Sequence, residues 1–217
     1  MKIVAVQKIL RANDQLAEEN RRKFNAAGVT CVNLVGSPGA GKTTLLEALF
    51  PAIKDRVRPA VIEGDIAGSI DAERIEALGV PVVQINTSGA CHLDANMIAA
   101  AIDGVDYGEV DMLFIENVGN LVCTAGYDLG EHVRIVVLST SEGDDKAAKY
   151  PTIFGGSDAL VITKMDLKPH LNFNTERIAA DMKRLKPGAP VFEVAAMQGE
   201  GIPEAAEWLL SKRPSRK

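Results

Sequence analysis

The sequence has few aromatic residues and no long apolar run. Aromatic residues make up 5% of the 217 positions, whereas hydrophobic residues of all kinds make up 47%. A core built mostly of aliphatic side chains is typical of buried parallel strands. No apolar run approaches the roughly 20 residues that a helix needs to cross a bilayer. The N-terminal segment also lacks a continuous apolar stretch and a small-residue cleavage site, so we expect neither membrane insertion nor secretion.

Cysteine is also scarce, and the 29 acidic residues outnumber the 24 Lys and Arg residues. The three cysteines are an odd number, which favours a reducing cytoplasm, where thiols serve metals or catalysis more readily than disulfides. The net charge of −5 argues against a nucleic-acid-binding protein. The one basic cluster, residues 212–217, is terminal, and we expect it to be solvated. These features predict a cytoplasmic protein that binds neither nucleic acid nor membranes.

Short β-branched runs alternate with helical patterns along most of the chain. This alternation predicts an α/β fold with a mostly parallel sheet covered by helices on both faces. We expect an N-terminal helical extension over residues 1–28, followed by one domain over residues 29–217. The expected strands span residues 32–35, 60–63, 82–85, 112–115, 134–138, 159–162 and 191–194. The first expected helix of this domain ends at residue 54. The others span residues 71–78, 93–102, 175–185 and 203–210.

A glycine-rich motif follows the first expected strand and opens the next helix. The residues Gly36-Ser37-Pro38-Gly39-Ala40-Gly41-Lys42-Thr43 fit the pattern G-x-x-x-x-G-K-[ST] in full. Glycines let backbone N–H groups turn inward around phosphate oxygens, and the helix N-terminus adds a favourable dipole. Lys42 would contact the β- and γ-phosphates, and the Thr43 hydroxyl would bind Mg²⁺. We include Thr44 in this nucleotide-binding set, and the motif makes the predicted three-layer fold that of a P-loop NTPase.

Acidic residues end two of the expected strands. Glu116 follows an apolar run, as the Mg²⁺-binding acid of a Walker B strand does. Asp65 ends another run and could orient or deprotonate the attacking water, or complete the Mg²⁺ shell. Glu63 and Asp71 are close rivals for that role. Because strands of a parallel sheet end at one edge, we expect Asp65 and Glu116 to form a catalytic set with Lys42.

A late loop resembles the N-K-x-D guanine motif of GTPases. It reads Thr163-Lys164-Met165-Asp166. Asp166 would accept hydrogen bonds from guanine N1–H and the 2-amino group, a donor pair that adenine lacks. Lys164 would lie along the base and the phosphate loop, and Ala196 would offer a backbone donor. Thr163 replaces the usual asparagine, which puts nucleotide affinity in doubt more than purine identity.

A cysteine–histidine pair is a candidate metal site. Cys91 and His92 are adjacent, and Cys123 follows Glu116 in one loop. Two thiolates and an imidazole suit Zn²⁺ or Ni²⁺. One chain supplies three donors, so a water, a further residue or a second subunit would complete the shell. The remaining candidates are expected to have no metal role: Cys31, His132 and His170.

Several ordered blocks resemble the hydrogenase nickel-incorporation GTPases of the HypB family. They include GSPGAGKTTLLEAL, VIEGDI, QINTSGACHLDA, FIENVGNLVC and STSEGDDKAAKYP, and they cover nearly the whole chain. The N-terminal RANDQLAEENRRKF also resembles the leading helix of that family.

The resemblance implies a GTPase of the signal-recognition/MinD class that dimerises with nucleotide. It implies a metal site at Cys91, His92 and Cys123, beside the switch regions and the dimer face. It also implies a small nickel-binding partner of the HypA type, which acts before nickel enters the large subunit of a [NiFe] hydrogenase. Residues 1–30 contain no cysteine and no histidine, so we expect no N-terminal nickel store.

Three alternatives remain open at this level. A urease-type nickel GTPase would show Cys-Pro-His, whereas this chain has Cys91-His92-Leu93. A P-loop small-molecule kinase would need an acceptor pocket and lid arginines, but not Lys164 and Asp166. A metal-storage or scaffold protein could use nucleotide only to lock a dimer.

Overall fold

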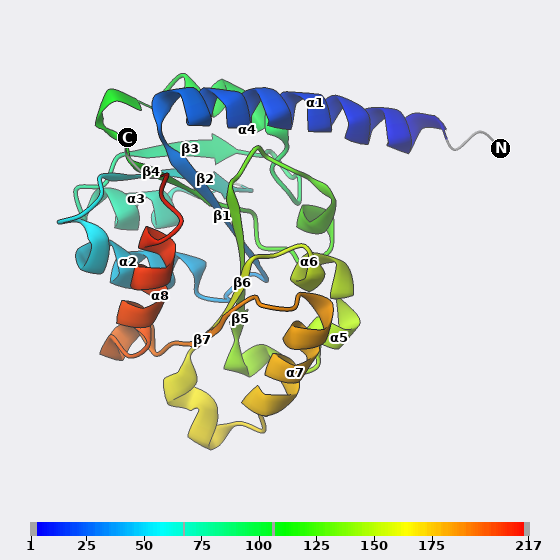
Figure 1. Ribbon diagram of the computed structural model, residues 1–217, viewed down its shortest axis with the longest axis vertical. Coiled ribbons are helices and arrows are strands. Elements are labelled where there is room, and N and C mark those ends of the chain that lie inside the picture. The colour runs from blue at the N-terminus through cyan, green and yellow to red at the C-terminus, as the bar shows by residue number, and fades with distance from the viewer. Residues whose placement is uncertain (1–3, 67, 106, 215–217) are drawn as a thin grey trace.

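The computed structural model describes residues 4–66, 68–105 and 107–214, and a seven-stranded sheet forms its centre (Figure 1). All strand pairs are parallel, in the order β3-β2-β4-β1-β5-β6-β7. The strands are β1 (Thr30–Gly36), β2 (Pro59–Asp65), β3 (Val82–Asn86), β4 (Met112–Glu116), β5 (Val133–Ser139), β6 (Ala159–Thr163) and β7 (Val191–Glu193). Because β1 lies between β4 and β5, the crevice at its carboxyl end is the place where such sheets bind ligands.

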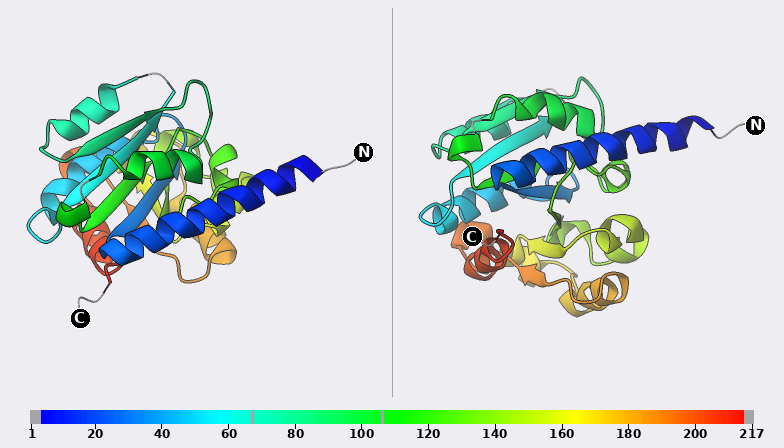
Figure 2. Two further views of the ribbon diagram at one scale, coloured as in Figure 1. Left: turned by 90° about the horizontal axis from the view of Figure 1, so that it is seen from above. Right: turned by 45° about the horizontal axis from the view of Figure 1, so that its top comes forward.

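Helices cover both faces of the sheet (Figures 1 and 2). One face carries α2, α3 and α8, whose apolar residues form one core cluster with Val32 and Leu34 of β1. The other face carries α1 and α4 over β2 and β4, with α5, α6 and α7 over β5 and β6. The helices are α1 (Val4–Ala27), α2 (Lys42–Ile53), α3 (Ile70–Glu76), α4 (Ala95–Ile102), α5 (Lys146–Lys149), α6 (Pro151–Gly155), α7 (Thr175–Leu185) and α8 (Ile202–Leu210). The predicted three-layer α/β fold is therefore confirmed.

Element boundaries differ from prediction for local reasons. Strand β2 continues to Asp65, two residues beyond its expected end, so Glu63 lies inside the sheet. Helix α4 begins at Ala95 because the Asp94 side chain caps it, accepting a hydrogen bond from the Met97 amide at 2.8 Å. The helices α5 and α6 were not predicted, since four and five residues are too few to show helical periodicity.

Helix α1 lies against α4, and its N-terminal half reaches past the rest of the fold (Figure 2). Its inward side buries Ala17 and Phe24 completely. The helix ends before Gly28, whose φ of +70° is the left-handed conformation that glycine adopts easily. Residues 1–3 of the predicted helix lie outside the described residues. In the part of the chain that the structure describes, no helix is long and apolar enough to span a bilayer.

Buried asparagines attach α1 to the domain. Asn20 is 1% exposed, and its amide donates to the carbonyl oxygens of Ala95 at 2.9 Å and of Leu129 at 3.1 Å. These contacts fix α1 both to the start of α4 and to the loop before β5. Sequence patterning alone identifies neither partner, because both are backbone atoms distant in sequence.

Replacing Asn20 by alanine should lower the free energy of unfolding by about 1–3 kcal/mol, because two buried carbonyl groups lose their donors. Urea denaturation monitored by circular dichroism measures the change. The exposed Gln15 of the same helix provides the matched control, and Q15A should change stability by less than about 0.5 kcal/mol. Equal effects of N20A and Q15A would show that the buried contacts do not hold α1 in place.

Candidate functional site

The phosphate loop connects β1 to α2 at the carboxyl edge of the sheet. Gly39 and Gly41 have φ angles of +74° and +88°, which favour glycine at both positions. A Cβ at Gly36 would collide with the carbonyl oxygen of Val137 on β5, so only glycine fits there. The loop therefore has the backbone that the motif predicts, and it opens directly into α2.

The base of the phosphate loop is braced by β6. The buried Thr163 hydroxyl donates to the carbonyl oxygen of Ala40 at 2.5 Å. Lys164, in a left-handed conformation with φ +57°, donates from Nζ to the carbonyl oxygen of Gly39 at 2.8 Å. Thr163, which stands where the usual asparagine would be, therefore holds the phosphate loop against β6, and Lys164 lies along that loop.

The remaining motif residues surround the same crevice. Lys42 and Thr43 are buried at the start of α2, and the hydroxyl of the half-buried Thr44 accepts from Arg74 at 3.1 Å. Asp166 is exposed in the 3-10 turn Met165–His170 after β6, and Ala196 begins the turn after β7. These two turns follow adjacent strands, which brings Asp166 and Ala196 to one end of the crevice.

Two buried carboxylates face each other across β2 and β4. Glu63 is the parallel-strand neighbour of Glu116, and each is 3% exposed. Glu116 accepts from the Thr43 hydroxyl at 2.8 Å. The second carboxylate oxygen of each residue, Oε2, is buried without a hydrogen-bond partner among the described residues. Buried polar atoms without partners are costly, so this pair is suited to a cation or a proton.

The environment raises the pKa of both carboxyl groups. Burial is the main cause for Glu63, followed by the charge of Glu116, and its pKa rises to about 8. Burial also raises the pKa of Glu116 to about 7, although Lys42 and the Thr43 hydroxyl oppose that shift. A divalent cation beside these groups would favour their charged forms. The residues therefore fit Mg²⁺ together with the Thr43 hydroxyl.

Asp65 ends β2 and makes its hydrogen bonds within the loop that follows. Its carboxylate accepts from the backbone amides of Ile66 at 2.7 Å and Gly68 at 2.9 Å. Asp71, the other rival, pairs with Arg74 at 2.9 Å. Glu63, which the sequence suggested only as a rival, is the acid that lies beside Glu116. The β2 boundary was the missing information, because it decides which acid lies inside the sheet.

The structure brings Cys91, His92 and Cys123 together. Their ligand atoms all lie within 4.8 Å of one another, and each residue is partly exposed. Cys91 Sγ is 3.7 Å from His92 Nδ1. The side-chain hydrogen bond between the Cys123 thiol and Cys91 is the main cause that raises the pKa of Cys123. Two thiols and an imidazole at this spacing fit a soft or borderline divalent metal ion such as Ni²⁺ or Zn²⁺.

A short segment joins this cluster to the carboxylate pair. Asn117 directly follows Glu116 and is 2% exposed. Its Oδ1 atom accepts from the backbone amide of Leu93, the residue after His92, at 3.2 Å. The same loop continues to Cys123, whose amide donates to Asn120 Oδ1 at 2.8 Å. The loop after β4 therefore contacts both sites, a role of Asn117 that no sequence motif indicated.

The other cysteine and histidines lie apart from this cluster. Cys31 is fully buried on β1, and burial raises the pKa of its thiol. His132 accepts from the Cys31 amide at 2.9 Å through Nδ1, and its Nε2 lies 3.2 Å from Asn25 Oδ1. His170 is exposed at the end of its 3-10 turn.

Curated relatives match over nearly the whole chain. The hydrogenase maturation factor HypB of Azotobacter vinelandii is 47% identical over 210 residues, which cover 97% of this chain and 69% of that protein. HypB of Escherichia coli K12 is 45% identical over 205 residues, covering 94% and 71%. The probable hydrogenase maturation factor HypB of Methanocaldococcus jannaschii is 43% identical over 201 residues, covering 93% and 91%.

Solved structures share the fold. The crystal structure of HypB from Helicobacter pylori in complex with nickel matches with a TM-score of 0.88 and 39% identity, covering 95% of this chain and 99% of that one. HypB from Archaeoglobus fulgidus matches with a TM-score of 0.87 and 36% identity, covering 94% and 100%. The signal recognition particle receptor FtsY of Elizabethkingia anophelis, at 17% identity and a TM-score of 0.56, shares the fold alone.

The family comparison agrees with these relatives. The family described as CobW/HypB/UreG, nucleotide-binding domain, matches residues 30–193, which include the phosphate loop, the carboxylate pair and the metal-ligand cluster. The matched range begins where β1 begins and ends with β7. The chain therefore belongs to the CobW/HypB/UreG family of nucleotide-binding proteins, and within it to the HypB hydrogenase maturation factors.

Proposed function

We propose that this protein binds and hydrolyses GTP and uses the nucleotide cycle to deliver nickel during the maturation of a [NiFe] hydrogenase. The observation that carries the proposal is the loop after β4. It begins at the buried Glu116 beside the phosphate loop and ends at Cys123 in the metal-ligand cluster. Because Glu116 and Cys123 lie on one short loop, a nucleotide-dependent movement of Glu116 would also move a metal ligand.

The nucleotide half of the proposal assigns one role to each group. Lys42 would contact the β- and γ-phosphates. Thr43, Glu116 and Glu63 would hold Mg²⁺, which would supply positive charge to the phosphates. Asp65, at the end of β2, retains the proposed role of orienting the attacking water once its loop contacts rearrange. Asp166 accepts hydrogen bonds from guanine, and the backbone amide of Ala196 donates a hydrogen bond to guanine.

The metal half treats nickel as cargo, with zinc as the competing ion. Cys91, His92 and Cys123 supply three donors, and a second copy of the chain or a water supplies the rest. Contacts to the γ-phosphate order the loop after β4, and hydrolysis releases them, which changes metal geometry and dimer affinity together. We place the protein in the cytoplasm as a nucleotide-dependent homodimer that receives nickel from a HypA-type chaperone and serves the hydrogenase large subunit.

Within the chain, we assign residues 29–217 to the GTPase domain and residues 1–28 to a helical extension. The support for the division is that the family match begins at residue 30. The buried contacts of α1 attach the extension to the domain, so we expect the two parts to unfold together.

A role in urease maturation is the second candidate. A relative from Helicobacter hepaticus, named hydrogenase/urease maturation factor HypB, is 46% identical over 215 residues that cover 97% of this chain and 88% of that protein. The same nickel-binding chemistry could serve either metalloenzyme. Nickel transfer to each apoenzyme, compared side by side, separates the two candidates.

Nickel affinity should depend on the bound nucleotide. We expect the nickel Kd measured with GDP to differ at least about 5-fold from that measured with Mg²⁺ and a non-hydrolysable GTP analogue. K42A should abolish this difference, and C123A should weaken nickel binding in both states. Equal nickel affinity and equal dimerisation in the two nucleotide states would defeat the proposed coupling.

Asp166 should determine the choice of base. D166N should lower GTP affinity by about 100-fold or more and improve binding of xanthosine triphosphate, because the amide can donate to the xanthine 2-oxo group. Fluorescent nucleotide titration measures both affinities. The exposed Asp55 gives a control of the same chemistry, so D55N should leave both unchanged. Wild-type protein that binds ATP as tightly as GTP would contradict the assignment.

The metal-free protein should lose stability as pH rises. The pKa of Glu63 is near 4.5 in the unfolded chain and about 8 in the fold, so the folded state binds the extra proton between these values. E63Q should therefore raise the free energy of unfolding by about 1–3 kcal/mol at pH 8 and much less at pH 5. Urea denaturation in the presence of a chelator measures this. Glu193 is exposed, so E193Q is the control. If the free energy of unfolding depends on pH in the same way in E63Q and in wild type, the raised pKa of Glu63 is disproved.

A further inference from the structure

The ring of Tyr127 stacks on the imidazole of His92. The ring centroids are 3.9 Å apart and the planes are inclined by 28°. We propose that Tyr127 is a positioning residue for His92 that sets nickel affinity without binding the metal. The inference rests on the proposed metal role of the cluster, and it concerns a residue outside the ligand set.

The stack restricts rotation of the His92 ring. His92 is partly exposed, and its Nδ1 atom faces Cys91 Sγ at 3.7 Å. Rotation of the imidazole about its bond to Cβ would move Nδ1 away from the two sulfur atoms. A flat ring at 3.9 Å leaves no room for that rotation, so the donor is held in place before the metal arrives. Groups that orient a metal ligand commonly change metal affinity 10- to 100-fold.

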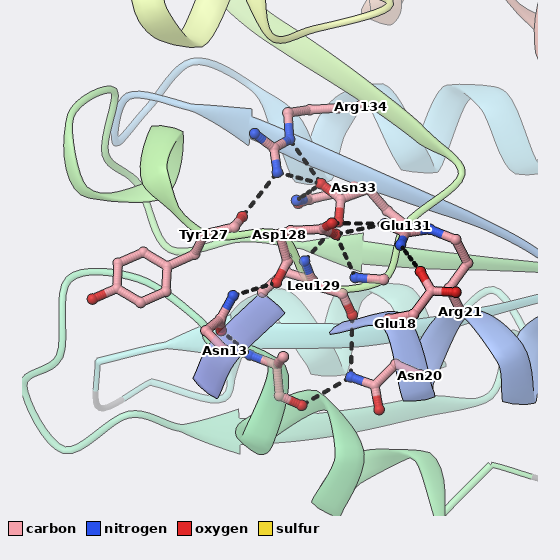
Figure 3. A network of polar contacts seen from close by, with 12 residues as sticks. Asn13, Glu18, Asn20, Arg21, Asn33, Tyr127, Asp128, Leu129, Glu131 and Arg134 are labelled. Carbon is pink, nitrogen blue, oxygen red and sulfur yellow. Dashed lines mark hydrogen bonds and ion pairs between the residues drawn. The ribbon is translucent and has the colours of Figure 1, made fainter. Parts of the chain in front are cut away.

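Hydrogen bonds to its backbone hold Tyr127 in place. Its carbonyl oxygen accepts from Arg134 Nη2 at 2.8 Å, and Arg134 Nε donates to Glu131 at 2.7 Å (Figure 3). Glu131 also accepts from the buried Asn33 of β1 at 3.0 Å. The loop that carries Tyr127 is therefore attached to the sheet on one side.

Helix α1 holds the same loop from the other side. Arg21 donates to both carboxylate oxygens of Asp128 at 2.8 Å, and Asn13 donates to the Asp128 carbonyl oxygen at 2.8 Å (Figure 3). Asn13 Oδ1 also accepts from the amide of Ala95, three residues after His92, at 2.9 Å. One asparagine thus links the segment of Tyr127 to the segment of His92. This network explains how two half-exposed rings keep a fixed relative position.

Simple packing is the competing explanation. Part of the Tyr127 side chain lies against the apolar cluster that contains Phe24 and Leu129. A residue that only fills this space could be replaced by leucine, whereas a residue that orients His92 requires a flat ring. Y127F retains the ring and Y127L retains most of the apolar volume, so the two variants separate the explanations.

The test measures nickel binding to full-length Y127F and Y127L by competition with a chromophoric chelator. Y127F should bind nickel within about twofold of wild type, and Y127L should bind about 10-fold more weakly. In the metal-free protein, the carbon-bound ring protons of His92 should show an upfield ring-current shift in wild type and Y127F. That shift should be lost in Y127L. Circular dichroism and cooperative thermal unfolding establish that each variant is folded.

The variants H92A, C91A and C123A separate failure of this inference from failure of the proposed function. If H92A weakens nickel binding while Y127L binds like wild type, Tyr127 does not position the ligand and the metal site stands. If all three ligand variants bind nickel like wild type, the metal site itself is wrong, and the inference falls with it. Loss of affinity in Y127L with an unchanged His92 proton shift also overturns the positioning role, because the effect then has another cause.

Discussion

The hydrogen bond between the Thr43 hydroxyl and Glu116 is the contact on which the rest of the site depends. At 2.8 Å, it joins the first turn of α2 to the end of β4. It satisfies the Oε1 oxygen of the buried Glu116. The Oε2 oxygens of Glu116 and Glu63 have no hydrogen-bond partner among the described residues. Two unsatisfied carboxylates in one sheet cost stability unless a cation or a proton is present. The crevice is therefore built for charge that arrives with a ligand.

The loop that follows β4 connects Glu116 to the cysteine cluster. Asn117 follows Glu116 and accepts from the amide of Leu93, so the residue after this acid is bonded to the segment that leads into α4. Farther along the loop, Asn120 holds the amide of Cys123. Each contact alone is an ordinary hydrogen bond, with a net contribution of about 1 kcal/mol. Their arrangement in one short segment is what gives a nucleotide site and a metal-ligand cluster a common support.

Helix α1 supports the cluster from the opposite side. Its buried asparagines and Arg21 contact the loop at Asp128 and Leu129 and the start of α4. The helix therefore contributes more than an amphipathic covering of the sheet. Its polar contacts fix the spacing between two segments on which His92 and Tyr127 lie.

Local pattern was sufficient for much of this protein. The strand–helix alternation predicted the three-layer fold, because strands buried on both faces are near-continuous apolar runs. The phosphate loop was evident because its glycines and Lys42 occur at a spacing that chance rarely produces. The adjacent Cys91 and His92, with Cys123 in a later loop, also marked a candidate cluster. In each case the information lies in residue type and spacing along one segment.

Contacts between distant segments could not be obtained in that way. Whether Glu63 or Asp65 lies beside Glu116 depends on the register of β2 against β4 and on where β2 ends. Thr163 takes over the bracing of the phosphate loop only because β6 brings its hydroxyl to the Ala40 carbonyl oxygen. The stacking of Tyr127 on His92 has no sequence signature, since it depends on how two loops are held in space. The sequence by itself thus determined the fold class, the phosphate loop and the ligand types, which are properties of local pattern. Only the tertiary structure decided which acid lies beside Glu116, which hydroxyl contacts the phosphate loop and which ring stacks on His92, because those neighbours depend on distances between segments far apart in the chain.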